Sequence, residues 1–305
     1  MSKKTIIFNG FRFTISHTGV LTCLACTPGN WGKDVYIPSA FSTGERITVI
    51  GEEAFLDSRG SYKEVTIDNN ISTIVPGAFK KASIDTVVWP ASCKTIPKYC
   101  FYQASIKSVI NTENVTVVER GAFEYSSIKT FKWPSLCPVI PPSCFCGTSL
   151  ESLTNCESVE VIEWAAFSDC KFKKFTVPKS VIKIGNSCFS RCSSLKKVIL
   201  HDGITFIGGS AFANTEISEI VWPTECKVIR ALCFGGSSLK RISNLEQVEV
   251  IEEFAFADTV YLEEIDLSGS VACSIKKYAF SRCNCKKIIY PYYPAGIILD
   301  ESFEE

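Results

Sequence analysis

The sequence predicts a mostly β repeat solenoid of about eleven coils, with a parallel sheet along one face. An Ala-Phe or Cys-Phe pair recurs at steps of 22 residues, with occasional steps of 23 or 24. Each repeat also contains one short segment in which apolar and polar residues alternate. A unit of this size with one strand is unable to bury its own apolar face, so neighbouring units must stack. The phenylalanines of the recurring pairs are Phe55, Phe79, Phe101, Phe123, Phe145, Phe167, Phe189, Phe212, Phe234, Phe256 and Phe280.

The repeat has a fixed pattern of apolar positions. Counted from its first apolar residue, offsets 0, 3, 9 and 12 are apolar, and offsets 16 and 17 hold a small residue and the phenylalanine. We expect the side chains at these six offsets to face the core. One copy consists of Ile84, Val87, Cys93, Ile96, Cys100 and Phe101.

The segment at 127–134, Ser-Ile-Lys-Thr-Phe-Lys-Trp-Pro, is typical of the strand that opens each repeat. Its alternation indicates a β-strand, and its proline ends that strand. Few residues remain between the phenylalanine of one repeat and the strand of the next. The stretch around the phenylalanine is therefore predicted to form a tight turn or a single short helical or 3-10 turn.

Most of the sixteen cysteines occupy positions of the repeat. Cysteine replaces valine or isoleucine at offset 9, and it replaces alanine at offset 16, as expected of a small apolar residue. The offset-16 cysteines lie two coils apart, about 10 Å, which is beyond the reach of a disulfide, so we expect free thiols at Cys100, Cys144, Cys188 and Cys233. Cys170 and Cys192 lie one coil apart, and a bridge between them stays open.

The two ends of the chain depart from the repeat. Residues 1–34 alternate on both sides of Asn9-Gly10, which predicts a hairpin that caps the solenoid. The solenoid itself is predicted over residues 35–290. Residues 291–305 are predicted to form a C-terminal cap or tail.

The repeats resemble a known family. The pattern L-x-x-V-x-[IW]-P, followed by I-G-x-x-A-F-x-x-C, is similar to the leucine-rich repeats of the BspA-like family of surface proteins. The resemblance extends over residues 35–290 in ten or more copies. It implies a leucine-rich repeat fold and a role in cell-surface adhesion or as a surface antigen. The chain departs from the commoner leucine-rich repeat at offset 8, where only Asn114 matches the usual asparagine.

A second period of 44 residues overlies the first. At offset 5, large apolar residues alternate with asparagine over much of the chain. An inward asparagine needs hydrogen-bond partners, so we expect it to bond loop backbone or an adjacent tryptophan indole. On this hypothesis Asn155→Leu reduces stability. The alternating residues include Trp89, Asn111, Trp133, Asn155, Trp222 and Asn244.

Composition and charge exclude several functions. Lys plus Arg and Asp plus Glu number 32 each, so no overall field attracts nucleic acid or an anionic membrane. The longest apolar runs are about six residues, which predicts no membrane insertion. The N-terminal sequence lacks the apolar region of a signal peptide. We expect a monomer.

Catalytic and metal-binding constellations are sparse. Two histidines, His17 and His201, do not suggest a base and nucleophile pair, so we expect no enzyme activity, no cofactor and no metal. Cys23 and Cys26 have the spacing of a redox or zinc site, but no second pair lies nearby. A thiol or metal-binding protein acting through these two cysteines stays as an alternative.

The side chains at offsets 2 and 4 are predicted to project from the sheet away from the core. They form a face with small hydroxyls first, lysines in the middle and acids near the end. Solenoids use such faces for protein recognition, although an ordinary solvated β-face has the same pattern. The candidate binding residues are Thr130, Lys132, Lys174, Thr176, Lys197, Ile199, Glu219, Arg241, Glu264 and Asp266.

The sequence thus predicts a non-enzymatic solenoid that binds a protein through its sheet face. The resemblance favours a surface antigen or adhesin with a host or cell-surface partner. The many free thiols and the absent signal peptide favour the alternative, an intracellular scaffold for protein interactions.

Overall fold

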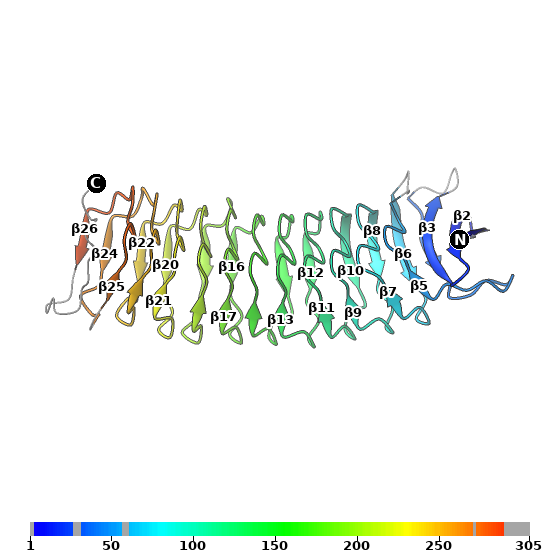
Figure 1. The fold of residues 1–305 in the computed structure, drawn as a ribbon, viewed down its shortest axis with the longest axis horizontal. Helices are drawn as coiled ribbons and strands as arrows, with labels where there is room; N and C mark the ends of the chain where they lie inside the picture. The colour runs from blue at the N-terminus through cyan, green and yellow to red at the C-terminus, as the bar shows by residue number, and fades with distance from the viewer. Residues whose placement is uncertain (1–2, 27–31, 57–60, 271–272, 290–305) are drawn as a thin grey trace. The chain divides into compact units, whose positions relative to one another are not determined.

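The structure is a computed structural model that describes residues 3–26, 32–56, 61–270 and 273–289. The chain forms two compact units, each treated separately below. The first comprises Met1–Cys137 and Cys144–Ser158, and the second comprises Pro138–Ser143 and Val159–Glu305. The described parts of both units contain strands and turns and no helix. Within each unit the strands of successive coils run parallel and in register (Figure 1).

Every coil of the solenoid contributes to two sheets, and only the first of these follows from the alternation of the sequence. In the first unit, the first sheet contains β4 (Val35–Ile37), β6 (Tyr62–Ile67), β8 (Ser83–Val88) and β10 (Ser105–Ile110). Its remaining strands, β12 (Thr130–Lys132) and β14 (Ser152–Thr154), pair with each other. The second sheet is made of two-residue strands at offsets 11 and 12, namely β5 (Val49–Ile50), β7 (Thr73–Ile74), β9 (Thr95–Ile96) and β11 (Val117–Val118).

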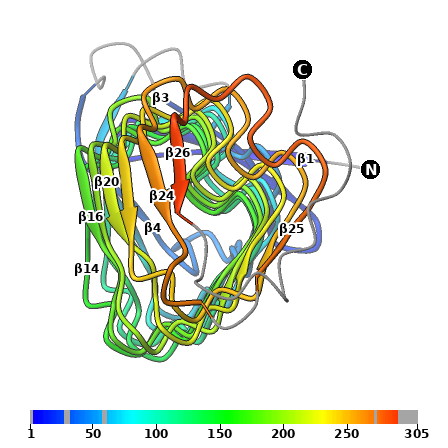
Figure 2. The ribbon, with the colours of Figure 1, turned by 90° about the vertical axis from the view of Figure 1, so that its left-hand side faces the viewer.

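The second unit repeats this arrangement. Its first sheet is a series of parallel pairs, β16 (Lys174–Thr176) with β18 (Lys197–Ile199), β20 (Glu219–Val221) with β22 (Arg241–Ser243), and β24 (Glu264–Asp266) with β26 (Lys287–Ile289). Strands β16, β20 and β24 lie on one side of the coils, and β25 lies on the other (Figure 2). The two-residue strands are β13 (Val139–Ile140), β15 (Val161–Ile162), β17 (Lys183–Ile184), β19 (Phe206–Ile207), β21 (Val228–Ile229), β23 (Val250–Ile251) and β25 (Ser274–Ile275).

The six predicted core positions are buried in most coils. In the copy that begins at Ile84, all six side chains are no more than 2% exposed. The phenylalanines stack face to face with those of neighbouring coils, for example Phe101 on Phe123 at 5.2 Å between ring centroids and 6° between planes. Such ring pairs add to the free energy of apolar burial. The repeat pattern therefore specifies the core, and the predicted solenoid with a parallel sheet is confirmed.

The turn around each phenylalanine is tight but not helical. Two residues per turn have left-handed backbone, as in Ser187 (φ 54°) and Arg191 (φ 61°) on either side of Cys188-Phe189. Alternate N–H groups consequently point to the next coil, and Phe189 N–H donates to the Ala211 carbonyl at 2.9 Å. A helix would direct these donors into its own turn. The turns thus form a third line of bonds between coils, which replaces the helical or 3-10 turn that we expected as one option.

The predicted N-terminal hairpin is present. Strand β1 (Lys3–Phe8) pairs antiparallel with β2 (Phe11–Ser16) around a two-residue turn, in which Asn9 and Gly10 both have positive φ. This is the two-residue hairpin geometry that Asn-Gly favours. Strand β3 (Val20–Cys26) pairs with β2 and also, in parallel, with β5. The division into 1–34, 35–290 and 291–305 stays a prediction, and residues 291–305 lie outside the described residues.

The tryptophans and asparagines at offset 5 form a regular hydrogen-bond pattern. The Nδ2 groups of Asn111, Asn155 and Asn244 donate to the backbone carbonyl of the tryptophan one coil earlier, at 2.6 to 2.7 Å. Each buried indole instead donates to the carbonyl four residues on, as Trp133 does to Cys137 at 2.8 Å. The expected bond to backbone is therefore confirmed, and the alternative bond to an indole is wrong. The asparagines are half-buried or exposed rather than inward, because their backbone is left-handed.

None of the fifteen described cysteines forms a disulfide, Cys170 and Cys192 included. Twelve of the fifteen are buried. Burial raises the pKa of Cys188 well above its ordinary value and that of Cys93 to about 11, since desolvation disfavours the thiolate. These thiols act as small core side chains, as the repeat pattern predicted.

Candidate functional site: the sheet face of the second unit

The exposed face of the first sheet is built by strict alternation. In β16, β18, β20, β22 and β24 the middle residue is buried and the two flanking residues are exposed. Successive side chains of a strand point to opposite faces. The buried middle residues fix which side faces solvent. All eight candidate residues that lie in this unit are accordingly exposed on one face.

The parallel register determines which side chains are neighbours on this face. Lys174 lies opposite Lys197, and Thr176 lies opposite Ile199. Glu219 lies opposite Arg241, and their side chains form an ion pair at 3.8 Å. Farther along, Glu264 pairs with Lys287 at 3.1 Å. The acidic and basic residues of the last four strands thus largely compensate one another.

Lys174 and Lys197 differ from these pairs. Among the described residues neither lysine has an ion-pair partner within 4.0 Å. Like charges directly opposite each other destabilise a sheet, and neighbouring strands are only about 4.8 Å apart. This end of the face therefore presents an uncompensated positive charge.

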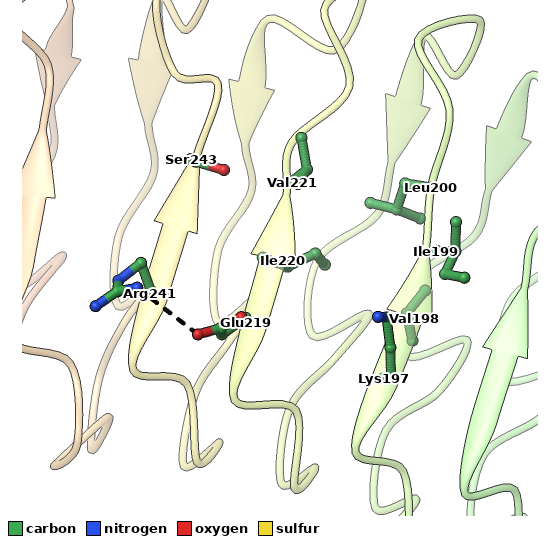
Figure 3. A pocket seen from close by; sticks show the side chains of 9 residues that line it. All are labelled: Lys197, Val198, Ile199, Leu200, Glu219, Ile220, Val221, Arg241 and Ser243. Atoms are coloured by element: carbon green, nitrogen blue, oxygen red, sulfur yellow. Dashed lines mark ion pairs between the residues drawn. The ribbon is translucent and has the colours of Figure 1, made fainter.

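Next to these lysines the face is hollowed (Figure 3). A groove of about 360 Å³ lies over β18, β20 and β22. Its apolar side chains include Ile199, which is 37% exposed, and Val221, which is 62% exposed. Strands β18 and β20 belong to different two-stranded sheets, so the groove spans a place where the sheet's ladder is interrupted. The lining residues are Lys197, Val198, Ile199, Leu200, Glu219, Ile220, Val221, Arg241 and Ser243.

The sequence prediction named four of the groove residues as candidates and omitted others. Lys197, Ile199, Glu219 and Arg241 all line the groove. Val221 is not among the candidates, although it is the most exposed apolar side chain of the groove. The sequence does mark Val221, because it is an apolar residue at offset 4, which is predicted to project away from the core.

Other candidates lie away from the groove. Thr130 and Lys132 are exposed on β12, in the first unit. Asp266 accepts hydrogen bonds from the hydroxyl and the backbone N–H of Ser268, and these lower its pKa. That carboxylate therefore stabilises the local turn.

The first unit has a separate hollow that the sequence did not indicate. It measures about 400 Å³ and lies on the turns, where Tyr99 and Tyr102 contact each other edge to face. Burial raises the pKa of Glu124 in its wall. The ion pair of Lys80 with Glu53 lies beside it and is internally compensated.

The alternative site at Cys23 and Cys26 stays a prediction. Cys23 is half-exposed on β3, and the side chain of Cys26 lies outside the described residues. Within the described ranges, no three His, Cys, Asp or Glu side chains are grouped to hold a metal. Nor do those ranges contain a helix of sufficient length and apolarity to cross a bilayer.

Several solved structures are similar to this chain. A leucine-rich repeat protein from Bacteroides ovatus is 20% identical, with a TM-score of 0.65 over 96% of this chain and 90% of that chain. A leucine rich cell surface protein from Faecalibacterium prausnitzii is 21% identical, with a TM-score of 0.48 over 95% of each chain. The pneumococcal vaccine antigen PcpA is 17% identical, with a TM-score of 0.49 over 94% of this chain and 85% of that chain.

At these identities the Bacteroides ovatus structure supports the fold alone. Comparison with curated proteins finds no match. The BspA type leucine rich repeat region, in contrast, matches residues 38–151, 118–240 and 227–305. Because these matches cover most of the sequence, the chain belongs to the BspA-type leucine-rich repeat family.

Proposed function

We propose that this protein is a non-enzymatic binding protein, which recognises a protein partner through the sheet face of its second unit. The observation that carries the proposal is the groove beside two uncompensated lysines. Its apolar side chains, Ile199 and Val221, offer surface to bury. Lys174 and Lys197 favour acidic side chains over basic ones.

The proposed partner segment is extended, acidic and apolar. An acidic side chain near Lys174 and Lys197 would relieve the repulsion between the two ammonium groups. An apolar side chain farther along the same segment would fill the groove at Val221. The ion pair of Glu219 with Arg241 leaves that side of the groove without excess charge, so specificity for acidic partners would come from the lysines.

Charge reversal of the two lysines tests this proposal. The probe is a fluorescent peptide of alternating glutamate and leucine, with a lysine and leucine peptide of equal length for comparison. Lys174→Glu with Lys197→Glu should weaken binding of the acidic peptide at least about tenfold, or about 1.4 kcal/mol. The effect should shrink as salt rises, because exposed charges are screened.

The matched control reverses two other exposed lysines of the same unit, Lys171 and Lys179, and so changes the net charge equally. Circular dichroism checks that both double variants fold. Equal affinity of the two double variants for the acidic peptide would refute recognition by the sheet face. Preference of the unaltered protein for the basic peptide would refute the assigned partner chemistry.

We further propose that this recognition takes place at a cell or host surface, as the family membership suggests. The free thiols favour a second candidate, a scaffold in a reducing compartment. A membrane-impermeant label applied to intact cells separates the two. Labelled protein supports the surface antigen or adhesin, and protection from the label supports the scaffold.

A further inference from the structure

The last coil contains a pair of cysteines unlike the others. Cys283 and Cys285 flank Asn284 in the irregular segment that leads into β26. Both are half-exposed, whereas twelve of the other described cysteines are buried. Cys144 and Cys146 have the same spacing, but their residues are only 0% and 9% exposed. Spacing alone therefore does not distinguish Cys283 and Cys285, whereas accessibility does.

The two sulfurs have different polar neighbours. The Cys283 Sγ lies 3.2 Å from the Thr259 hydroxyl oxygen and donates to the Thr259 carbonyl at 3.4 Å, whereas the Cys285 Sγ donates to the Lys287 carbonyl at 3.5 Å. The contact between the two cysteines lowers the pKa of Cys283, against the opposing effect of burial, and raises the pKa of Cys285. Cys283 is therefore the first of the two to become a thiolate, and Cys285 keeps its proton longer.

Charged neighbours of the pair are mostly compensated. Arg282 forms an ion pair with Asp258 at 2.8 Å, and Lys287 forms one with Glu264 at 3.1 Å. Lys286 is exposed beside Cys285. The contact with Cys285, rather than a neighbouring cation, is therefore the main cause that lowers the pKa of Cys283.

We infer that Cys283 and Cys285 form a thiol–disulfide exchange site whose oxidant is a small-molecule disulfide. The Cys283 thiolate attacks one sulfur of the disulfide, whose S–S bond breaks, and the first small thiolate leaves and takes up a proton. Cys285 then loses its proton to water and attacks the Cys283 sulfur, which releases the second small thiol. Two protein thiols are oxidised to one disulfide, and the small disulfide is reduced to two thiols.

The short loop makes the resulting bridge exchangeable. Because Cys283 and Cys285 are two residues apart in the chain, their Cα atoms are separated by at most about 7 Å. A disulfide requires a Cα separation of about 4.4 to 6.8 Å. A ring closed over one intervening residue has little freedom to relax, and strained disulfides are reduced more readily. The site is therefore suited to reversible exchange rather than to permanent stabilisation. This inference does not depend on the proposed protein binding.

The test uses glutathione disulfide as the probe and the full chain at pH 7. Trypsin cleaves after Arg282 and Lys286, so both cysteines fall on the peptide 283–286. We expect this peptide to lose two hydrogen atoms at least about tenfold faster than Cys144 and Cys146 lose their thiols in the same digest. Dithiothreitol should restore it.

Two variants assign the roles. Cys285→Ser should trap glutathione on Cys283, and Cys283→Ser should slow the reaction of Cys285.

Oxidation of 283–286 no faster than that of Cys144 and Cys146, or glutathione trapped on Cys285 in preference to Cys283, would overturn the inference.

Discussion

Replacing Asn155 with leucine tests the link between the asparagines and the stacking of coils. The Asn155 Nδ2 group donates to the Trp133 carbonyl at 2.7 Å, and its backbone is left-handed, with φ at 62°. The substitution removes the hydrogen bond, a loss of about 0.5 to 1.5 kcal/mol. It also places a leucine in a backbone conformation that costs about 1 to 2 kcal/mol.

Leucine recovers part of this loss. Because position 155 is half-buried, the added apolar burial is worth at most about 1 kcal/mol, half of that of a fully buried leucine. The net expectation is a destabilisation of about 0.5 to 3.5 kcal/mol. Asn155→Gly separates the two causes, since glycine accepts the left-handed backbone and loses only the hydrogen bond. Its expected cost is about 0.5 to 1.5 kcal/mol.

The assay is guanidinium chloride unfolding, followed by circular dichroism and tryptophan fluorescence. The midpoints should fall in the order unaltered protein, Asn155→Gly, Asn155→Leu, with similar slopes. A leucine variant as stable as the unaltered protein would refute the reasoning altogether. A glycine variant as unstable as the leucine variant would show that the backbone conformation contributes nothing.

Two further substitutions probe the core and the contact between coils. Phe123 stacks between Phe101 and Phe145. Phe123→Ala should therefore lower the free energy of unfolding by about 3 to 5 kcal/mol, measured by thermal or denaturant unfolding, and Phe123→Leu should lower it markedly less. Equal losses in the two variants would show that the volume filled by the ring is unimportant. At Gly185 an added Cβ would lie 2.5 Å from the Trp164 nitrogen and 2.6 Å from the Glu163 carbonyl carbon. Gly185→Ala should therefore cost about 1 to 3 kcal/mol, whereas Gly203→Ala, which meets only the His201 ring at 3.2 Å, should be nearly neutral. A tolerated alanine at 185 would mean that neighbouring coils separate easily.

The core of the fold was predictable because it repeats. Each slot is sampled many times, so the equivalence of cysteine with valine or alanine emerges from one sequence. The second sheet was not predicted, since strands of two residues such as Val161–Ile162 are too short to produce an alternation. The left-handed turn positions were also missed, because they hold residues as different as Ser187 and Leu232. Their conformation is imposed by the stacked coils rather than by local preference.

The candidate site was predictable in orientation but not in shape. Alternation around Val198 and Ile220 sufficed to place Lys197 and Glu219 on the exposed face. The groove lies where the hydrogen-bond ladder between β18 and β20 is interrupted. No residue type in the sequence marks that interruption. The unlike environments of Cys283 and Cys146 likewise depend on the coils around them.

The bond from asparagine to the preceding tryptophan coil has a consequence for how such a protein changes length. In the first unit Trp89 is followed by Asn111, and Trp133 by Asn155. Excision of a single coil would join two tryptophan coils or two asparagine coils and leave one member of a pair without its counterpart. Excision of two coils, the 44 residues from one tryptophan to the next, restores every partner. Duplication and loss of repeats should therefore be tolerated two repeats at a time. The unit that can be added or removed is a pair of consecutive repeats.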